Sequence, residues 1–218
     1  MTHLSHVRCF TLLAAALALT GCMVKETKPL PKVNAIQAQQ QIGQDELLDL
    51  AIREFDPGIP DDIATDEDAL AKKRIYPDVR RAESRVIPSK LRATLEATGQ
   101  WGPVRVVPAS VQFVDVIVTG RILESTGVAL ALEISAGDSM GRVWIEKRRY
   151  ESRADTGSYK TEAALKARDP FQNVYSQIAN DLVVARDKLT AADRRDVRRV
   201  TSLRFAQDLA PDNFKGYL

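Results

Sequence analysis

Three stretches in the middle of the chain decide the fold: DVIVTGRIL (115–123), VALALEI (128–134) and VWIEKRRY (143–150). In each of them apolar side chains alternate with other residues, which is the period of a β-strand that buries one face. The connections, 124–127 and 137–141, are short and contain glycine. Such turns join neighbouring antiparallel strands, so the sequence predicts a three-stranded meander whose strands each have one solvated face.

Two shorter strands and a helix are predicted before the meander. The stretch 47–55 (LLDLAIREF) has period two and predicts a strand, with a short helix as the alternative. Residues 77–98 predict a helix that ends beside Gly99 and kinks or restarts at Pro88. Residues 104–107 (VRVV) predict a further strand. The apolar positions of the helix are Val79, Ala82, Val86, Leu91 and Leu95.

The last third of the chain predicts two helices. Asp169-Pro170 is typical of a helix N-terminus, and Thr190 with Asp193 forms the pattern of a capping box. The second helix stops by Pro211. The predicted fold class is therefore α+β, with a mostly antiparallel sheet, helices packed on one face and a helical C-terminal extension. The apolar stripes are Phe171, Val174, Tyr175, Ile178, Leu182 and Leu189 in the first helix, and Val197, Val200, Leu203 and Leu209 in the second.

Rare residues are confined to the N-terminus. The 218 residues include two histidines, both in the first six positions, and two cysteines, Cys9 and Cys22. The run FTLLAAALAL (10–19) is too short to span a membrane, which takes about 20 residues, and is typical of the core of a signal peptide. An ordinary signal peptide or a buried N-terminal helix remains the alternative. A hydrophobic content of 44% and a charged content of 28% exclude wholesale disorder.

The run ends in Leu19-Thr20-Gly21-Cys22, which resembles the lipobox of bacterial lipoproteins. The resemblance implies signal-peptidase recognition of Leu19, Thr20 and Gly21, cleavage after Gly21, and acylation of Cys22. Two or more acyl chains hold a protein stably on a membrane. Met23 follows the cysteine in place of the aspartate that retains enterobacterial lipoproteins in the inner membrane. The expected location is therefore the outer membrane, facing the periplasm.

Cleavage after Gly21 removes one charged residue, Arg8, and leaves 30 basic against 29 acidic residues, a net charge of +1. A chain this close to neutral gives no argument for nucleic-acid binding. The expected organisation is a signal peptide (1–21), a lipidated N-terminus with a polar, flexible tether (22–46), an α/β domain (47–160) and a C-terminal helical segment packing on it (161–218).

Motifs with catalytic or metal-binding potential are weak. Residues 137–141 (GDSMG) match G-x-S-x-G, but that chemistry needs a base, usually histidine, and a strand-turn-helix context. A hairpin turn is the preferred interpretation. Without histidine or a free cysteine after residue 22, zinc, copper and iron lose their usual ligands, so no cofactor is expected. The acidic stretch 61–68 lacks the order of a calcium loop and predicts a solvated loop.

Two binding interpretations remain open. Four arginines of the last helix offer a face for an anionic partner, with a solvated face balanced by Asp193 and Asp196 as the alternative. Carboxylate pairs alone can also hydrolyse or bind glycans, with Trp101 or Trp144 as an aromatic platform, although no pair stands out. The four arginines are Arg194, Arg195, Arg198 and Arg199.

Residues 91–151 resemble a known family of periplasmic domains. The pattern runs from Leu91 and Leu95 through TGQWGPVRVVP (98–108) and VDVIVTGRI (114–122) to LALEI (130–134) and an Asp138…Trp144 segment. It resembles the α/β domain shared by the TolB N-terminal domain, the curli-secretion lipoprotein CsgG and the penicillin-binding-protein activator LpoB. It is also similar to a group of proteobacterial lipoproteins carrying the whole pattern. The resemblance implies a docking domain.

Together these patterns predict a non-enzymatic, lipid-anchored accessory lipoprotein of the cell envelope. The expected partners are the membrane, through the acylated N-terminus, and an envelope protein complex, either a peptidoglycan synthase or a secretion machinery. The alternative is a peptidoglycan- or glycan-binding protein, with hydrolysis less favoured. No nucleic acid and no cofactor are expected.

Overall fold

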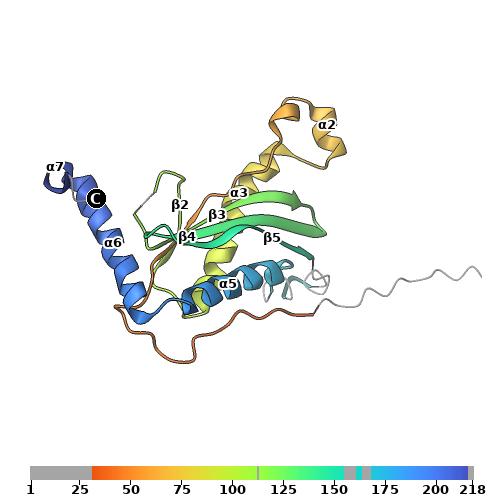
Figure 1. Cartoon of the computed structure of the whole chain (residues 1–218). Coiled ribbons are helices and arrows are strands. Elements are labelled where there is room, and N and C mark those ends of the chain that lie inside the picture. The colour runs from red at the N-terminus through yellow and green to blue at the C-terminus, as the bar shows by residue number, and fades with distance from the viewer. Residues whose placement is uncertain (1–30, 112, 155–160, 164–167, 216–218) are drawn as a thin grey trace, which may run out of the picture.

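A computed structural model describes residues 31–111, 113–154, 161–163 and 168–215 (Figure 1). The predicted signal peptide, the lipobox with Cys22 and the first part of the tether lie outside these residues. The strands are β1 (Leu50–Arg53), β2 (Val104–Val107), β3 (Val116–Ser125), β4 (Ala129–Asp138) and β5 (Val143–Arg153). The helices are η2 (Asp61–Ile63), α2 (Glu67–Lys72), α3 (Pro77–Ala97), α5 (Gln172–Asp187), α6 (Ala191–Leu209) and α7 (Pro211–Phe214).

The α+β class is confirmed, but the prediction of a mostly antiparallel sheet is wrong, because the five-stranded sheet is mixed. Its order is β2-β1-β3-β4-β5, and β1 pairs in parallel with both β2 and β3. The physical reason lies in α3, which carries the chain from the end of β1 back to its start. A helix-containing crossover of this kind is what parallel neighbours require. Alternation within a strand does not reveal the direction of its neighbour.

The predicted meander is confirmed. β3 pairs antiparallel with β4, and β4 pairs antiparallel with β5. The pairing shifts register after Ile122 and again near Ala136, and Lys147 in β5 has a positive φ of 39°. Such bulges re-aim the side chains of an edge strand and increase its twist.

Helix α3 continues through Pro88, so the expected restart does not occur. Proline has no N–H, and it therefore leaves the carbonyl four residues earlier without its helical partner. That carbonyl belongs to Ser84, and it accepts a hydrogen bond from the backbone N–H of Phe55 at 2.9 Å. The freed acceptor thereby ties α3 to the chain just after β1, so the proline becomes a point of attachment.

The predicted apolar face of α3 is wrong in its first half. Val79 and Val86 are about half exposed, whereas Arg80 and Ser84 are buried. From Ile87 onward the prediction holds, since Leu91 and Leu95 are fully buried. The buried positions of the first turns are therefore polar: Arg80 lies 4.0 Å from Glu83 of the same helix, and burial lowers the pKa of Arg80.

Helix α5 buries its predicted stripe, with Val174, Ile178 and Leu182 fully enclosed. These side chains join those of α3 and the sheet in one hydrophobic core. Burial and the nearby Asp169 carboxylate raise the pKa of Tyr175, which keeps its phenol neutral. The largest fully buried core residues are Leu48, Leu50, Ile52, Leu91, Leu95, Val116, Ile122, Leu130, Leu132, Ile134, Ile178 and Leu182.

Helix α6 starts at the predicted capping box, since Thr190 and Asp193 bond reciprocally. The hydrogen bonds from Thr190 lower the pKa of Asp193. The predicted apolar stripe is only partly used: Val197 is fully buried, but Leu203 and Leu209 are exposed. Figure 1 shows α6 and α7 extending away from the sheet. Among the described residues, no helix is both long enough and apolar enough to cross a bilayer.

Candidate functional site

The segment of residues 31–38, here called the strap, is bound along helix α5. Two asparagines of that helix hold it. The side chain of Asn173 accepts from the N–H of Val33 at 3.0 Å and donates to the carbonyl of Pro31 at 3.0 Å. The side chain of Asn180 accepts from the N–H of Ile36 at 2.8 Å and donates to the carbonyl of Asn34 at 3.0 Å. Each carboxamide therefore bonds the strap backbone on both sides of one residue.

The spacing of the two asparagines along α5 matches the spacing of the two strap N–H groups that they bind. Asn173 and Asn180 are seven residues apart, which is two turns or about 10.5 Å along a helix. Val33 and Ile36 are three residues apart, which is about 10 Å in an extended chain. An extended backbone can therefore meet both asparagines without distortion. Because the bonds are to the backbone, this clamp holds the direction of the strap rather than particular side chains.

Further contacts extend the attachment beyond the strap. The N–H of Ala38 donates to the carbonyl of Thr98 at 2.8 Å, which fixes the end of the strap to the end of α3. Residues 31–46, which the sequence places in the tether, are thus bonded to the domain at several points. Residues 22–30 of the predicted tether lie outside the described residues.

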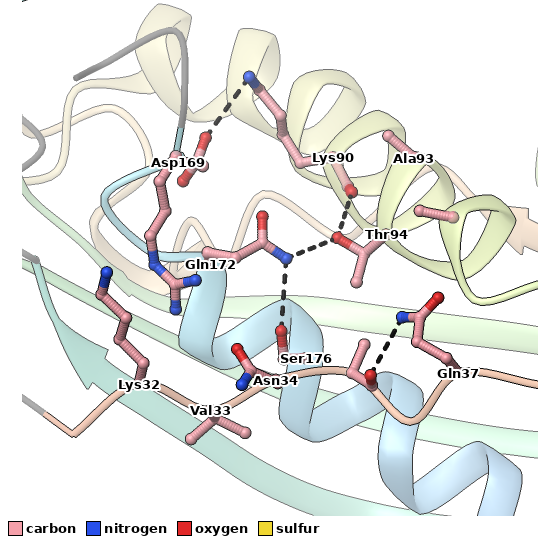
Figure 2. A pocket seen from close by; sticks show the side chains of 13 residues that line it. Lys32, Val33, Asn34, Gln37, Lys90, Ala93, Thr94, Asp169, Gln172 and Ser176 are labelled. Carbon is pink, nitrogen blue, oxygen red and sulfur yellow. Dashed lines mark hydrogen bonds and ion pairs between the residues drawn. The ribbon is translucent and has the colours of Figure 1, made fainter.

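A groove of about 930 Å³ lies between the strap, α3 and α5 (Figure 2). Its walls combine polar and apolar side chains. Thr94 from α3 and Gln172 and Ser176 from α5 form a hydrogen-bonded row across it, with Gln172 Nε2 donating to Thr94 Oγ1 at 2.9 Å and to Ser176 Oγ at 3.4 Å. Figure 2 shows Lys32 at one end of the strap and Gln37 at the other, with this row between them. The groove offers hydrogen-bond donors and acceptors over its length.

Three cations and one carboxylate line the groove: Lys32, Lys90, Arg168 and Asp169. Lys90 Nζ lies 3.4 Å from a carboxylate oxygen of Asp169. Arg168 donates to the Asn173 side chain at 2.7 Å, an uncharged partner. Lys32 is exposed and makes no ion pair with any described residue. The groove therefore carries an excess of positive charge, and the chemistry it favours is the binding of anions.

The four arginines predicted as an anionic-partner face lie on α6, and most of their contacts are with the chain itself. Arg194 donates to the carboxylate of Glu46 and to the carbonyl of Leu189. Arg198 donates to the carbonyls of Gln44 and Leu47. Binding of an external anion by these arginines stays a prediction. In the structure, Arg194 and Arg198 hold residues 44–47 against the start of α6.

The other two arginines of that set are more exposed. Arg195 lies 3.7 Å from Asp45 and 3.8 Å from Glu46, and Arg199 lies 3.2 Å from Asp196 one helical turn earlier. Every arginine of the predicted face thus has an anionic or carbonyl partner within the chain. Of the local balance that the sequence offered as the alternative, the pair of Asp196 with Arg199 is present, whereas Asp193 pairs with Arg142.

The G-x-S-x-G match is a hairpin turn, as predicted. Asp138 Oδ1 accepts from the N–H groups of Met140 and Arg142, and Gly141 takes a positive φ of 84°. Ser139 is buried, and its hydroxyl donates to the carbonyl of Val197 at 2.7 Å. The serine therefore fastens α6 to the turn between β4 and β5.

The aromatic platform of the glycan alternative is not open. The rings of Trp101 and Trp144 lie 6.2 Å apart; Trp101 is 7% exposed and Trp144 packs against the core. Trp144 Nε1 donates to Asp138 at 3.1 Å, and the guanidinium of Arg186 stands over the Trp101 ring at 5.3 Å. Both tryptophans therefore serve packing at the end of the sheet.

One carboxylate pair is brought together at the start of the parallel strands. Asp115 accepts from the N–H of Asp49 at 2.9 Å and is itself buried. Burial and the neighbouring Asp115 raise the pKa of Asp49. Neither side chain lines the groove. No described group of three or more histidine, cysteine, aspartate or glutamate residues could hold a metal ion.

The acidic stretch 61–68 is not a simple loop, which corrects the prediction. It contains η2 and the start of α2. Asp66 accepts from the N–H of Ala69 at 2.9 Å and caps α2, and Glu67 and Asp68 lie in its first turn. Acidic residues at a helix N-terminus are favoured by the helix dipole, which accounts for the cluster without a cation.

The groove residues were missed at the sequence level. Asn173 and Asn180 lie on the polar face of a predicted helix, and their seven-residue spacing was the available signal. Lys32 and Lys90 are ordinary surface residues in the sequence, and only the docking of the strap brings them to one groove.

Comparison with known proteins adds little. No protein-family model matches the chain, and no curated protein matches it. Among solved structures, a PelC variant dodecamer from Paraburkholderia phytofirmans is 15% identical, with a TM-score of 0.38. The match covers 70% of this chain and 94% of that chain.

Replacing Asn180 by alanine is expected to loosen the strap. Two hydrogen bonds to the strap backbone are lost, at a net cost of about 1–2 kcal/mol, so the Ile36 N–H should exchange with solvent roughly 5- to 30-fold faster. Hydrogen–deuterium exchange of residues 31–38 measures this. Gln177→Ala on the same helix is the control, since the Gln177 side chain makes no hydrogen bond with any described residue. Equal exchange in the two variants would show that Asn180 does not hold the strap.

Proposed function

We propose that this protein is a lipid-anchored, periplasm-facing accessory lipoprotein of the cell envelope that acts by binding rather than by catalysis. Cys22 carries the lipid, and the outer membrane is the proposed location. The sequence Leu19-Thr20-Gly21-Cys22 after a short apolar run supports the anchor. The absence of histidine and cysteine from the sequence after residue 22 supports a binding role, because the commonest nucleophile–base pairs need one of them.

The observation that carries the proposal is the clamp on the strap. Cys22 and Pro31 are nine residues apart, and nine residues span at most about 32 Å however extended they are. Because Asn173 bonds the carbonyl of Pro31, the domain begins at that point. An acylated Cys22 would therefore hold the domain close to the membrane surface and in a restricted orientation.

We further infer that α3 and α5 cover one face of the sheet and leave the other available to a protein partner. The two helices contact each other, and both contact strands of the sheet. A shallow hollow of about 400 Å³ on the sheet is lined by Ile117, Thr119, Ser135 and Val143 among others. Val143 is 68% exposed, and Met140, in the turn that precedes β5, is 41% exposed. Exposed apolar side chains gathered in this way mark protein-binding surfaces.

The proposed partner is an envelope protein complex, a peptidoglycan synthase or a secretion machinery. This choice rests on the resemblance of residues 91–151 to the TolB N-terminal, CsgG and LpoB domains. The glycan-binding alternative is less favoured, because Trp101 and Trp144 pack on each other at the margin of the core.

A photo-crosslinking amino acid in place of Val143 should capture the partner. In intact cells we expect one reproducible crosslinked protein, because this position lies in the exposed apolar hollow. The same substitution at Asp62, an exposed residue of η2, is the matched control. The proposal of a protein partner fails if position 143 gives no reproducible crosslink, or only those that position 62 also gives.

A further inference from the structure

The positive charge of the groove is less compensated than that of the other basic cluster. On α6, Arg194, Arg195 and Arg199 each lie within 4 Å of a carboxylate of the chain. In the groove only Lys90 has such a partner, Asp169, while Arg168 bonds an amide and Lys32 makes no ion pair with a described residue. An anion entering the groove would gain two cations that pair with no carboxylate of the described residues.

The groove also lies where the chain leaves the domain. Lys32 lines it and is the residue after Pro31, the first described residue of the strap. Figure 2 shows Lys32 at the end of the strap from which the chain runs toward the N-terminus. Ten residues separate Lys32 from Cys22, a reach of at most about 35 Å. A lipid attached to Cys22 would therefore keep this end of the groove within about 35 Å of the headgroups, close enough to contact them.

We propose that the groove docks on the membrane that carries the anchor, with Lys32 and Arg168 contacting lipid phosphate groups. This inference rests on the proposed lipid anchoring. A guanidinium offers paired N–H donors to phosphate, and a flexible lysine supplies a mobile point charge. The protein thereby acquires a second, electrostatic attachment to the membrane. This attachment orients the domain with the N-terminal end of α5 toward the lipid.

Neighbouring groups set the limits of this contact. Asp169 is the one carboxylate among the groove residues, and it stays paired with Lys90 at 3.4 Å. Arg168 also bonds Asn173, the residue that clamps the strap. Lys32 is thus the cleanest position to change, because its side chain is exposed and supports no described contact.

The test uses the mature chain, residues 22–218 with Cys22→Ser, so that no acyl chain contributes to binding. Vesicles of neutral phosphatidylcholine, with or without 30% phosphatidylglycerol, are titrated with protein and sedimented. We expect binding only to the anionic vesicles, weakened about 5-fold by Lys32→Gln, since each basic residue near such a surface contributes about 1 kcal/mol.

The matched control is Arg81→Gln, the same charge change on an exposed part of α3 beside Asp78, nine residues before Lys90. It should leave vesicle binding unchanged. The inference is overturned if the parent chain does not sediment with anionic vesicles, or if Lys32→Gln and Arg81→Gln weaken binding equally. If inorganic phosphate displaces the protein from vesicles more strongly than sodium chloride of the same ionic strength does, the groove is a site for free phosphate instead. Acylation of Cys22 is measured separately, so the two proposals fail by different results.

Discussion

Gly58→Ala is expected to destabilise the folded chain by more than about 3 kcal/mol, enough to unfold a marginal domain. Gly58 has a φ of +66°, a left-handed conformation that costs an L-residue about 1–2 kcal/mol. An added Cβ would also lie 1.8 Å from the carbonyl oxygen of Ile122. That oxygen belongs to the backbone of β3, so no side-chain rotation relieves the contact.

The turn around Gly58 has no room to move away. The N–H of Asp56 donates to the carbonyl of Gly120 at 2.8 Å, and the carbonyl of Asp56 accepts from the N–H of Ile122 at 2.9 Å. These bonds lay the chain after β1 directly on β3. A side chain at position 58 must therefore break this contact between the two strands or distort β3.

Two other glycines separate the causes. Gly141 has a φ of +84° but nothing within 4 Å of an added Cβ, so Gly141→Ala should cost only the conformational penalty of about 1–2 kcal/mol. At Gly127 the backbone is outside the left-handed region and an added Cβ has open space, so Gly127→Ala should be nearly neutral. Urea denaturation of the three variants gives the free energies of unfolding. Equal losses for Gly58→Ala and Gly141→Ala would show that the clash with Ile122 is absent.

The elements that local sequence determines were predictable. The meander follows from alternation and short glycine-containing turns, and the capping box at Thr190 and Asp193 needs only four residues. The buried stripe of α5 follows from helical period. The parallel pairing of β1 with β2 and β3 was not predictable in this way, because it depends on where α3 returns the chain.

The exposed first half of α3 has a similar origin. Val79 and Val86 have the helical spacing of a core face, but both are about half exposed. A contact with the chain before the helix determines which side of α3 faces the sheet. Pro88 frees the carbonyl of Ser84, and Phe55 bonds it, so the side of the helix that bears Ser84 must face the sheet. A single polar contact distant in sequence thus overrides two apolar side chains.

The candidate site could be predicted only in its parts. The strap and α5 lie about 140 residues apart in the chain, and nothing local connects Val33 with Asn173. The four arginines of α6 were singled out correctly as a basic cluster, but residues 44–47 that meet them lie about 150 positions earlier. Charge in a sequence shows where cations are, whereas the fold decides which remain without a partner.

Loss of the lipid from Cys22→Ser is the second large effect expected. Acylation at this residue would keep Pro31, where the strap is clamped to the domain, within about 32 Å of the membrane. Two or more acyl chains anchor a protein stably, whereas a few lysines and arginines contribute only weak, salt-sensitive attachment. The anchor thus accounts for most of the proposed membrane affinity, and the groove would orient the domain.

Labelling growing cells with radioactive palmitate tests the lipid anchor most directly. The chain has only two cysteines, so Cys9→Ser is a matched control for Cys22→Ser. We predict that the wild-type chain and Cys9→Ser incorporate the label and that Cys22→Ser incorporates none. Label of wild-type intensity in Cys22→Ser, or no label in the wild-type chain, would contradict the proposal that Cys22 carries the lipid.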